Sequence, residues 1–544
     1  MPVLSESTIP TMIAAAARTF DGHPAIVDDG VTVSYRELAQ RVRAVAKAYL
    51  ALGVEHGDRV AIWIPNRLEF ILALLGAQVI GAVAVPLNTR YTGHEARAIL
   101  ERSRSRVLVV ADRFLDKGYI RLLRGSAAPD ALEASPVKGL PHLERLVDVD
   151  LETSGDGVST WADFVAGGAA VDDAVLDART ATVTKDDLVD MLFTSGTTGQ
   201  PKGVLSAHRQ TLSVAQSWAT GGKLTPDDHY LIVNPLFHGF GYKAGLMASL
   251  VSGSTIYLAE TFDPDQVLDM IEDDRISVLP GPPTIFTTLI DHPHRREHDL
   301  SSLRFAVCGA STVPQTLFRD MVEILGFESV AQAYGLTECV VATMSRDDED
   351  FEHMQDTTGP AVAGVEIRIV DEHNQPLPVG RSGEIVLRGE NVTLGYFEND
   401  EANRAAFDDE GWFHSGDIGE MDEHGCVKIT DRLKDMFIVG GFNVYPAEVE
   451  DVLRQHPAVN ESAVISVEDP RLGTVGWAYV LLLHDADPAP TEAELIAFCR
   501  DRLANFKVPR EIIFVQDYPR NATGKIMKIA LREDAAKRPA TAIG

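Results

Sequence analysis

Helix-like and strand-like segments alternate through the first hundred residues, and this alternation restricts the possible folds more than any other feature. Residues 35–52 and 68–79 have apolar side chains at helical spacing, whereas 59–64 and 107–111 are short apolar runs typical of buried strands. Such alternation predicts helices packed on a largely parallel sheet. The pattern therefore indicates a fold of the α/β class.

The pattern returns after a weakly patterned stretch. Residues 112–185 are rich in Ala, Gly, Asp and Pro, and we expect them to form surface excursions. Further strand-like runs lie at 189–193, 230–233, 255–258, 278–279 and 305–307. These runs predict a second α/β unit over about 185–340.

The segments become shorter after residue 359. Strand-like runs joined by turns lie at 365–370, 383–387 and 426–429, and they predict a small β subdomain. The part after Asp431 is typical of a compact α+β unit. Its expected elements are helices at 446–455 and 492–503 and strands at 463–467 and 477–483.

Composition argues against several classes of partner. At 544 residues, the chain is long enough for two or more globular domains. Its net charge of −31 argues against nucleic acid or an anionic membrane as a partner. The four cysteines are far apart, which predicts neither a zinc site nor a disulfide framework. The N-terminus lacks a basic segment followed by an apolar one, so we expect a cytoplasmic protein.

The segment 70–87 is strongly apolar, with Gln78 as its single polar residue. It approaches the length of a membrane span. Gly76, Gly81 and Pro86 interrupt it, and its last part is typical of a short buried strand. We therefore expect a core helix followed by a strand, and no stable insertion into a membrane.

Residues 194–203 read TSGTTGQPKG and follow an apolar run. Glycines let a backbone approach a ligand closely, and free N–H groups, hydroxyls and an ammonium are suited to a polyphosphate. The segment differs from the common phosphate loop, because Pro201 precedes Lys202 and Gly203 follows it. Taken alone, an ordinary Gly/Thr turn between a strand and a helix is the commoner explanation.

Two more segments combine residue types that suit a nucleotide. Residues 332–338 read QAYGLTE, in which Tyr334 is suited to stacking on a base and Glu338 to binding a metal ion. Residues 411–419 read GWFHSGDIG and place Asp417 in a Gly-flanked turn, where it is suited to ribose hydroxyls. Taken individually, packing, surface exposure and turn capping are the commoner roles of these side chains.

Two segments near the C-terminus complete the set, DRLKDMFIVGGFNVYPAEVE at 431–450 and PRNATGKIMK at 519–528. In this order, the five segments resemble the adenylate-forming superfamily, which includes acyl-CoA synthetases, peptide-synthetase adenylation domains and beetle luciferases. The resemblance covers nearly the whole chain. It implies an AMP-binding domain over 1–431, a hinge over 432–436, a small mobile C-terminal domain over 437–534 and a flexible tail over 535–544.

The resemblance also implies roles for individual residues. The phosphates of ATP would be contacted by Thr194, Ser195, Gly196, Thr197, Thr198, Gly199 and Lys202. Other nucleotide contacts would come from Gly309, Ala310, Ser311, Tyr334, Gly335, Thr337, Asp417, Arg432 and the hinge residue Lys434. Glu338 would hold Mg²⁺, and Gly440 and Gly441 would line the path of coenzyme A. The catalytic residues would be Lys525, His238, Thr198 and Glu338.

The implied enzyme is an AMP-forming acid–thiol ligase that uses ATP, Mg²⁺ and coenzyme A. A carboxylate attacks the α-phosphorus of ATP, and positioned cations lower the barrier by offsetting negative charge in the transition state. Lys525 would bridge the carboxylate and the α-phosphate. Pyrophosphate leaves, and rotation of the C-terminal domain then admits the thiol to the acyl-adenylate.

The segment NPLFHGFGYKAG at 234–245 bears on the acid substrate. His238 resembles the aromatic gate between acyl pocket and thiol tunnel, with a satisfied core histidine as the alternative. Gly309 would also face the acyl group. Lys243 is unusual, because alkyl-chain enzymes place apolar groups there. It would either meet a polar group of the substrate or point outward from the start of a helix.

Four strings, SAHRQTL, GYKAG, LPGPPTI and LANFKVPR, resemble actinobacterial CoA ligases of steroid breakdown that act on an indane-dione propanoate. The substrate implied is a bicyclic keto-propanoate. The alternatives are a general short- or medium-chain fatty acid or aryl acid CoA ligase, a luciferase-like enzyme and a carrier-loading enzyme. A carrier-loading enzyme is expected to have a carrier domain, for which the chain after Lys525 is too short.

The spacing from Pro519 to Lys525 also resembles sites modified by bacterial lysine acetyltransferases, which would remove the charge of Lys525. The expected partners are therefore a small-molecule carboxylic acid, coenzyme A and an acetyltransferase. The oligomeric state is left open, with a homodimer among the alternatives.

Overall fold

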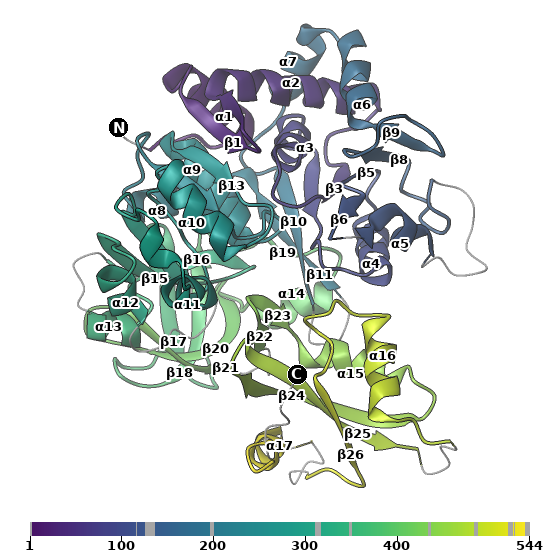
Figure 1. Ribbon diagram of the computed structural model, residues 1–544, viewed down its shortest axis with the longest axis vertical. Coiled ribbons are helices and arrows are strands. Elements are labelled where there is room, and N and C mark those ends of the chain that lie inside the picture. The colour runs from purple at the N-terminus through teal and green to yellow at the C-terminus, as the bar shows by residue number, and fades with distance from the viewer. Residues whose placement is uncertain are drawn as a thin grey trace. The chain divides into compact units, whose positions relative to one another are not determined.

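The computed structural model describes residues 3–115, 117–125, 136–195, 201–309, 317–346, 351–432, 437–483, 488–519, 526 and 528–538. The chain divides into two compact units. The first contains residues 1–89, 97–193 and 203–431, and the second contains residues 90–96, 194–202 and 432–544. Figure 1 labels the elements in chain order.

The main sheet of the first unit has the strand order β19-β11-β10-β4-β3-β5-β8-β9. Neighbouring strands from β10 to β9 are parallel, as the alternating pattern predicts. The strands are β3 Arg59–Trp63, β4 Val83–Pro86, β5 Val107–Val110, β8 Arg145–Asp148, β9 Val158–Thr160, β10 Leu188–Ser195, β11 Pro201–Ala207 and β19 Gly395–Tyr396. The central strands are almost wholly buried, which explains their continuous apolar runs.

A second sheet has the order β12-β13-β1-β2, and a third has the order β14-β15-β16. Their strands are β1 Pro24–Asp28, β2 Val31–Ser34, β12 His229–Ile232, β13 Thr255–Leu258, β14 Phe305–Gly309, β15 Ser329–Leu336 and β16 Cys339–Met344. Single-residue bridges join Val278 to Tyr230 and to Phe305. The run at 278–279 is therefore a link between the two sheets and not a strand of its own.

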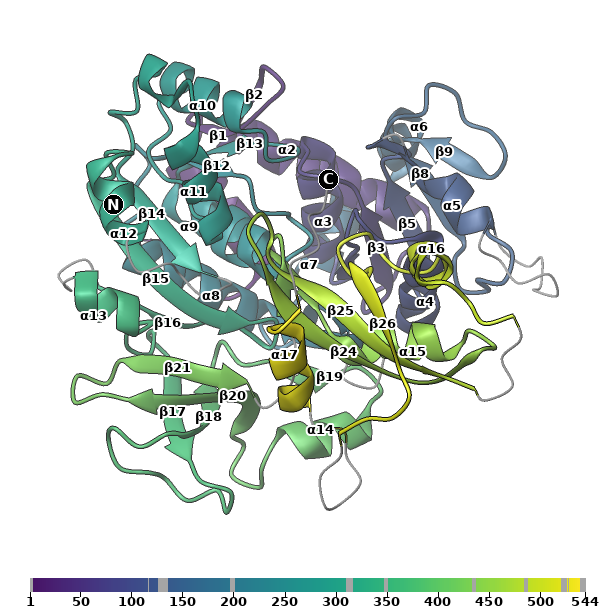
Figure 2. The same ribbon diagram turned by 60° about the horizontal axis from the view of Figure 1, so that its bottom comes forward.

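An antiparallel sheet precedes residue 432, and it confirms the expected β subdomain (Figure 2). Its order is β17-β18-β20-β21, with β17 Val365–Val370, β18 Gly383–Gly389, β20 Phe413–Met421 and β21 Val427–Arg432. Two-residue strands β6 Arg113–Phe114 and β7 Lys117–Gly118 form a separate pair.

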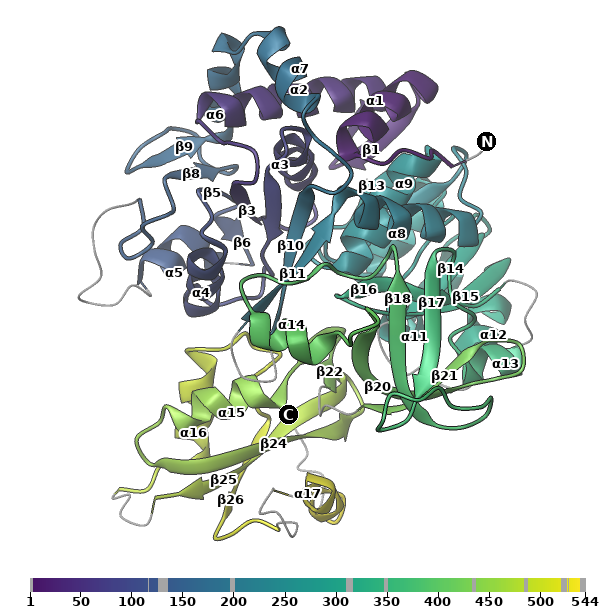
Figure 3. The same ribbon diagram turned by 180° about the vertical axis from the view of Figure 1, so that it is seen from behind.

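Helices surround the sheets of the first unit (Figure 3). The helices that precede β12 in the sequence are α1 Ile9–Thr19, α2 Tyr35–Ala51, α3 Leu68–Val79, α4 Gly93–Ser103, α5 Tyr119–Gly125, α6 Trp161–Gly167, α7 Asp173–Thr180 and α8 His208–Gly221. The later ones are the π-helix η2 Phe240–Met247, α9 Ala248–Ser252, α10 Pro264–Asp273, α11 Pro283–Asp291, α12 Leu317–Glu323, α13 Phe351–Asp356 and α14 Asp400–Ala406.

Local sequence explains two of these helices. α2 begins at a capping box, in which the Ser34 backbone N–H donates to Glu37 and the Glu37 N–H donates to the Ser34 hydroxyl. In α3, every residue except Glu69 is buried, so the apolar segment is a core helix followed by strand β4, as predicted. Among the described residues, no helix combines the length and apolarity needed to cross a membrane.

The described residues do not form the two consecutive α/β units that the sequence predicted. Strand β1 pairs with β13, and β10 pairs with β4, so each half of the sequence contributes strands to the sheet of the other. The stretch 112–185 was expected on the surface, yet it supplies β8 and β9 to the main sheet. These strands have three or four residues each, which is too short to give a recognisable pattern among polar residues.

The C-terminal part of the second unit is an α+β fold, as predicted. Its sheet has the order β23-β22-β25-β24, and β26 pairs in parallel with β25. The elements are β22 Phe437–Val439, β23 Phe442–Val444, α15 Pro446–Arg454, β24 Val459–Asp469, β25 Gly473–Leu482, α16 Glu492–Arg500, β26 Glu511–Val515 and α17 Lys528–Ala535. All four cysteines of the chain are free and buried.

Candidate active site

The predicted phosphate loop connects strands β10 and β11. Thr194 and Ser195 lie at the end of β10, and Lys202 lies near the start of β11. A methyl group at Gly203 would approach the sulfur of Met191 to 2.8 Å, so glycine allows β11 to lie this close to β10. Because a strand follows the loop, the segment differs from an ordinary turn between a strand and a helix.

Tyr334 and Asp417 are brought together from distant parts of the sequence. The hydroxyl of Tyr334 on β15 donates to Oδ2 of Asp417 on β20 at 2.6 Å, and each residue is 6% exposed. Gly309 ends β14 opposite Ala333 of β15, and these strands are parallel. Carboxyl ends of parallel strands commonly bind ligands. Three of the predicted nucleotide residues therefore lie on one pair of strands and the sheet next to it.

Glu338 lies in the turn between β15 and β16, directly after Thr337. Its Oε1 accepts a hydrogen bond from the hydroxyl of Tyr396 at 2.8 Å, and its backbone oxygen accepts one from the Thr393 N–H at 2.7 Å. Mg²⁺ prefers oxygen ligands, and the neighbouring residues Thr337 and Glu338 offer a hydroxyl and a carboxylate of that kind. These residues fit the predicted Mg²⁺ site.

The segment 391–397, which we call the crossing segment, connects this turn to β11. The Gln210 side chain on α8 donates a hydrogen bond to the backbone oxygen of Val392. The other contacts are with backbone groups or strand neighbours, namely Asn391 with Val341, Thr393 with Leu205, Tyr396 with Val204 and Phe397 with Gly203. The crossing segment was not predicted to belong to the site. A single tyrosine in LGYF carries no motif that would have indicated it.

His238 lies in the turn between β12 and the π-helix η2. Its side chain is exposed, and its Nδ1 accepts a hydrogen bond from the Phe240 N–H at 3.2 Å. A methyl group at Gly241 would lie 2.4 Å from the backbone oxygen of Pro235, so the turn is tightly folded. The His238 side chain has exposed surface, yet desolvation by the surrounding protein lowers its pKa, and its role as a gate stays a prediction. π-Helices are frequent at functional sites.

Lys243 lies within η2 and is 2% exposed, so it does not point outward from the start of a helix. Its Nζ lies 3.1 Å from Oδ1 of Asp190 and donates a hydrogen bond to the hydroxyl of Ser206 at 2.7 Å. The ammonium has an ionic partner inside the protein, which neither of the two predicted alternatives included, and its contact with the substrate stays a prediction. Asp190 was not singled out in the sequence, because its partner is distant along the chain.

Several predicted residues lie outside the described part of the chain, namely Gly196, Thr197, Thr198, Gly199, Ala310, Ser311, Lys434 and Lys525. Arg432 ends β21, and its side chain is also outside it. Gly440 and Gly441 form the turn between β22 and β23, with φ of +54° and +87°. Positive φ at both central residues is typical of a tight hairpin. Their role toward coenzyme A stays a prediction.

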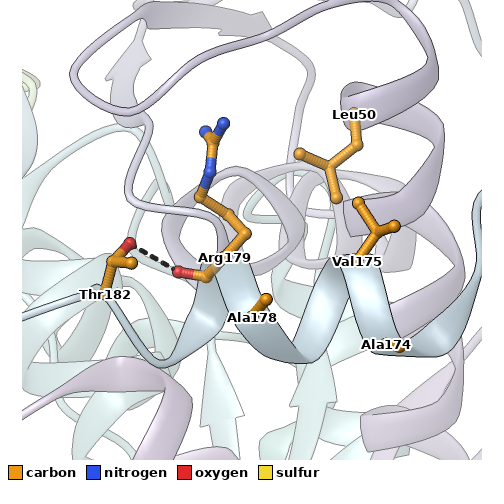
Figure 4. Close-up of a pocket in the computed structure, with 6 residues that line it drawn as sticks. All are labelled: Leu50, Ala174, Val175, Ala178, Arg179 and Thr182. Atoms are coloured by element: carbon orange, nitrogen blue, oxygen red, sulfur yellow. Dashed lines mark hydrogen bonds between the residues drawn. The ribbon is translucent and has the colours of Figure 1, made fainter.

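An apolar recess and a group of possible metal ligands lie apart from the predicted site residues in the sequence. Figure 4 shows an apolar recess between α2 and α7, lined by Leu50, Ala174, Val175, Ala178, Arg179 and Thr182. The side chains of His353, Asp422 and Cys426 bring possible metal ligands within 4.8 Å of one another. Nε2 of His353 already lies 2.7 Å from Oδ2 of Asp422, and nitrogen and sulfur donors do not suit Mg²⁺.

Comparison with known proteins gives matches along the whole described fold. A family model of AMP-binding enzymes matches residues 13–397, and a model of the C-terminal domain of AMP-binding enzymes matches residues 448–525. A (7a-methyl-1,5-dioxo-octahydro-1H-inden-4-yl)propanoyl:CoA ligase from Rhodococcus jostii is 46% identical over 97% of this chain and 99% of its own length. The ligase of the same name from Mycobacterium tuberculosis is 48% identical over 97% of this chain and 98% of its own length.

A solved structure gives a similar result. The o-succinylbenzoate CoA synthetase from Bacillus subtilis, bound to a product analogue, superposes with a TM-score of 0.77 at 28% identity. The superposition covers 96% of this chain and 98% of that one. Large N-terminal and small C-terminal domains are thus shared across the match.

Proposed function

Since the chain belongs to the family of AMP-binding enzymes, we propose that it is an acyl-CoA ligase whose acid is a bicyclic keto-propanoate of the indane-dione class. It is an acid–thiol ligase that uses ATP, coenzyme A and Mg²⁺. The observation that carries the substrate proposal is the identity of 46% and 48% to two ligases named for this acid. Both matches span 97% of the chain, so they include the acyl side of the site.

In the first half-reaction, a carboxylate oxygen bonds to the α-phosphorus of ATP, and the bond to pyrophosphate breaks. The hydrogen bond from Tyr334 to Asp417 holds the tyrosine ring in one orientation, which suits a surface for the adenine. Asp417 would accept hydrogen bonds from the ribose. When bound at Glu338, Mg²⁺ would offset the charge of the phosphates. Lys525 would supply the cation for the attacking carboxylate.

In the second half-reaction, the sulfur of coenzyme A bonds to the acyl carbon, and AMP leaves with the bonding electrons. The proton of the thiol passes to solvent or to the departing phosphate. We propose that His238 lies between the acid and the thiol, because its exposed ring is held by the Phe240 N–H in a tightly folded turn. Gly440 and Gly441 would leave room for the narrow pantetheine arm.

The proposal is tested by measuring pyrophosphate release for a panel of acids, with and without coenzyme A. The panel contains bicyclic keto-propanoates, aryl acids and fatty acids of matched carbon number. We expect the highest kcat/KM for the keto-propanoates, with AMP and the acyl-CoA formed in equal amounts when coenzyme A is present. A preference for fatty acids or aryl acids would refute the substrate class, and release of ADP would refute the ligase reaction.

We further propose that the enzyme works in the cytoplasm and that acetylation of Lys525 switches off adenylation. Acetylation would remove the charge that the first half-reaction requires. Mass spectrometry of protein from the native host, in several carbon sources, should detect acetylated Lys525 in the less active fraction. Absence of this modification in every condition would refute the regulatory role.

A further inference from the structure

The buried ion pair of Lys243 and Asp190 has no role in the reaction described above. Lys243 is 2% exposed, and Asp190 is completely buried. Taking two charges out of water is costly, and replacing such a pair with apolar residues is often neutral or stabilising. A contribution to stability is therefore a weak explanation of the pair. The position of the pair in the fold indicates another role.

The second carboxylate oxygen of Asp190 accepts a hydrogen bond. Thr211 on α8 donates a hydrogen bond to Oδ2 of Asp190 at 2.8 Å. The hydroxyl of Tyr242, the residue before Lys243, accepts a hydrogen bond from Gln78 on α3 at 2.7 Å. Burial raises the pKa of Tyr242, and the charge of Asp190 raises it further, so this hydroxyl stays neutral beside the pair. The network joins β10 to helices α3, α8 and η2.

The two residues of the pair and Ser206, the hydrogen-bond partner of Lys243, lie on elements that lead to the predicted site. Asp190 is on β10, which enters the phosphate loop, and Ser206 is on β11, which leaves it. Lys243 is on η2, which begins directly after the turn that carries His238. The ammonium of Lys243 thus holds both strands of the loop and the helix of the acyl side at a single point.

We propose that Lys243 and Asp190 are positioning residues of adenylation, which hold strands β10 and β11, on either side of residues 196–200, at a fixed separation from η2 on the acyl side of the site. The proposal rests on the proposed ligase function. The pair does not touch the reacting atoms. Its effect comes from geometry, because small errors in the distance between two reactants have large effects on rate. A single buried charge without its partner would disturb the fold, whereas removal of both charges together leaves no unpaired ion.

The test compares Lys243→Met, Asp190→Asn and the double variant Lys243→Met/Asp190→Asn. Adenylation is measured as pyrophosphate release with two acids, a bicyclic keto-propanoate and a fatty acid of matched size. We expect the double variant to fold, to keep KM for ATP and acid within about threefold, and to lose kcat at least 30-fold with both acids. Lys243→Arg, which keeps the charge, should recover part of the lost kcat.

Thioester formation from a supplied acyl-adenylate provides a second readout. This step does not use the phosphate loop, so the double variant should keep it within about threefold of the wild-type rate. The matched control removes the ion pair of Arg304 and Asp228, which lie 2.9 Å apart in the same unit on neither strand of the loop. The control variant Arg304→Met/Asp228→Asn should lose stability without loss of kcat in its folded fraction.

The other outcomes each overturn the proposal. A loss confined to the keto-propanoate would mean that Lys243 contacts the substrate. An unchanged kcat in the folded double variant, with lower stability only, would mean a structural role. Wild-type activity in the same assay tests the ligase function separately. The variants are compared on the acid that the wild-type enzyme uses best, so a different substrate class leaves the comparison valid.

Discussion

His208 shows, for a single residue, how burial couples protonation to stability. It lies at the start of α8, fully buried, and its Nδ1 accepts a hydrogen bond from the Ile9 N–H at 3.1 Å. Burial lowers the pKa of His208 to about 4, and the charge of Asp187 opposes this shift only in part. An exposed histidine in the unfolded chain has a pKa of about 6.5. The unfolded state therefore binds the proton more readily between these two values.

This difference predicts a loss of stability in mild acid. The contribution of neutral His208 is complete above about pH 6.5 and decreases as the pH falls toward 4. Between about pH 6.5 and 5, the loss is on the order of 1.5 kcal/mol. His208→Asn keeps an acceptor for the Ile9 N–H but does not titrate. In denaturant unfolding, the wild type should lose more stability than the variant over this range, and a pH-independent difference would contradict the prediction.

Gly335 is a residue that no other amino acid can replace without moving the backbone. Gly335 lies near the end of β15, and a methyl group there would lie 2.0 Å from the backbone oxygen of Val340 on β16, next to the turn that carries Glu338. We expect Gly335→Ala to lower kcat/KM for adenylation about 100-fold, because the turn must shift. Gly167→Ala is the control, since Gly167 is helical with nothing within 4 Å of the added methyl. Full activity of Gly335→Ala in the same assay would refute the argument.

Among the elements, the crossing segment 391–397 connects β11 to the turn of Glu338, and Tyr396 is its contact with the carboxylate. Loss of a group that orients a metal ligand typically costs 10- to 100-fold in activity or metal affinity. We therefore expect Tyr396→Phe to lower adenylation at least about tenfold and to raise the Mg²⁺ concentration needed for half-maximal rate.

The matched control for this substitution is Tyr49→Phe. It removes a buried hydroxyl that donates to the backbone oxygen of Ala73, in a part of the unit away from Glu338. Titration of Mg²⁺ in the pyrophosphate assay should give the wild-type midpoint for Tyr49→Phe. An unshifted midpoint for Tyr396→Phe would show that its hydroxyl does not position Glu338.

Elements with a strong local signal were predictable from the sequence. The α2 helix has a capping box at Ser34, and α3 has a continuous apolar surface, so both agree closely with the expected ranges. Strands β8 and β9 have three or four residues, and tertiary pairing stabilises them without a sequence pattern. Contacts within the candidate site could likewise be predicted only where both residues belong to recognised motifs. The contact of Tyr334 with Asp417 joins two recognised motifs, but the contacts of Tyr396 and Asp190 depend on pairing between distant segments.

For the whole molecule, the protein and its substrates carry charge of the same sign. The chain has a net charge of −31, and ATP, coenzyme A and the acid are all anions. Binding therefore depends on local cations and not on the overall field. Lys243 is already balanced by Asp190, so the cations for ATP and the carboxylate must come from other residues. We propose Lys202 and Lys525 for these roles.

Division of the reaction between two half-reactions gives the strongest test of Lys525, which lies outside the described residues. We expect Lys525→Ala to lower adenylation by about 100- to 1000-fold, the usual cost of removing one charge-stabilising group from a transition state. Thioester formation from a supplied acyl-adenylate should stay within about threefold of wild type, because the phosphate has already been transferred. Lys528→Ala is the control, since Lys528 pairs with Glu450 at 2.8 Å and should leave adenylation unchanged. Equal loss of both half-reactions in Lys525→Ala would instead indicate that the substitution damages the C-terminal fold.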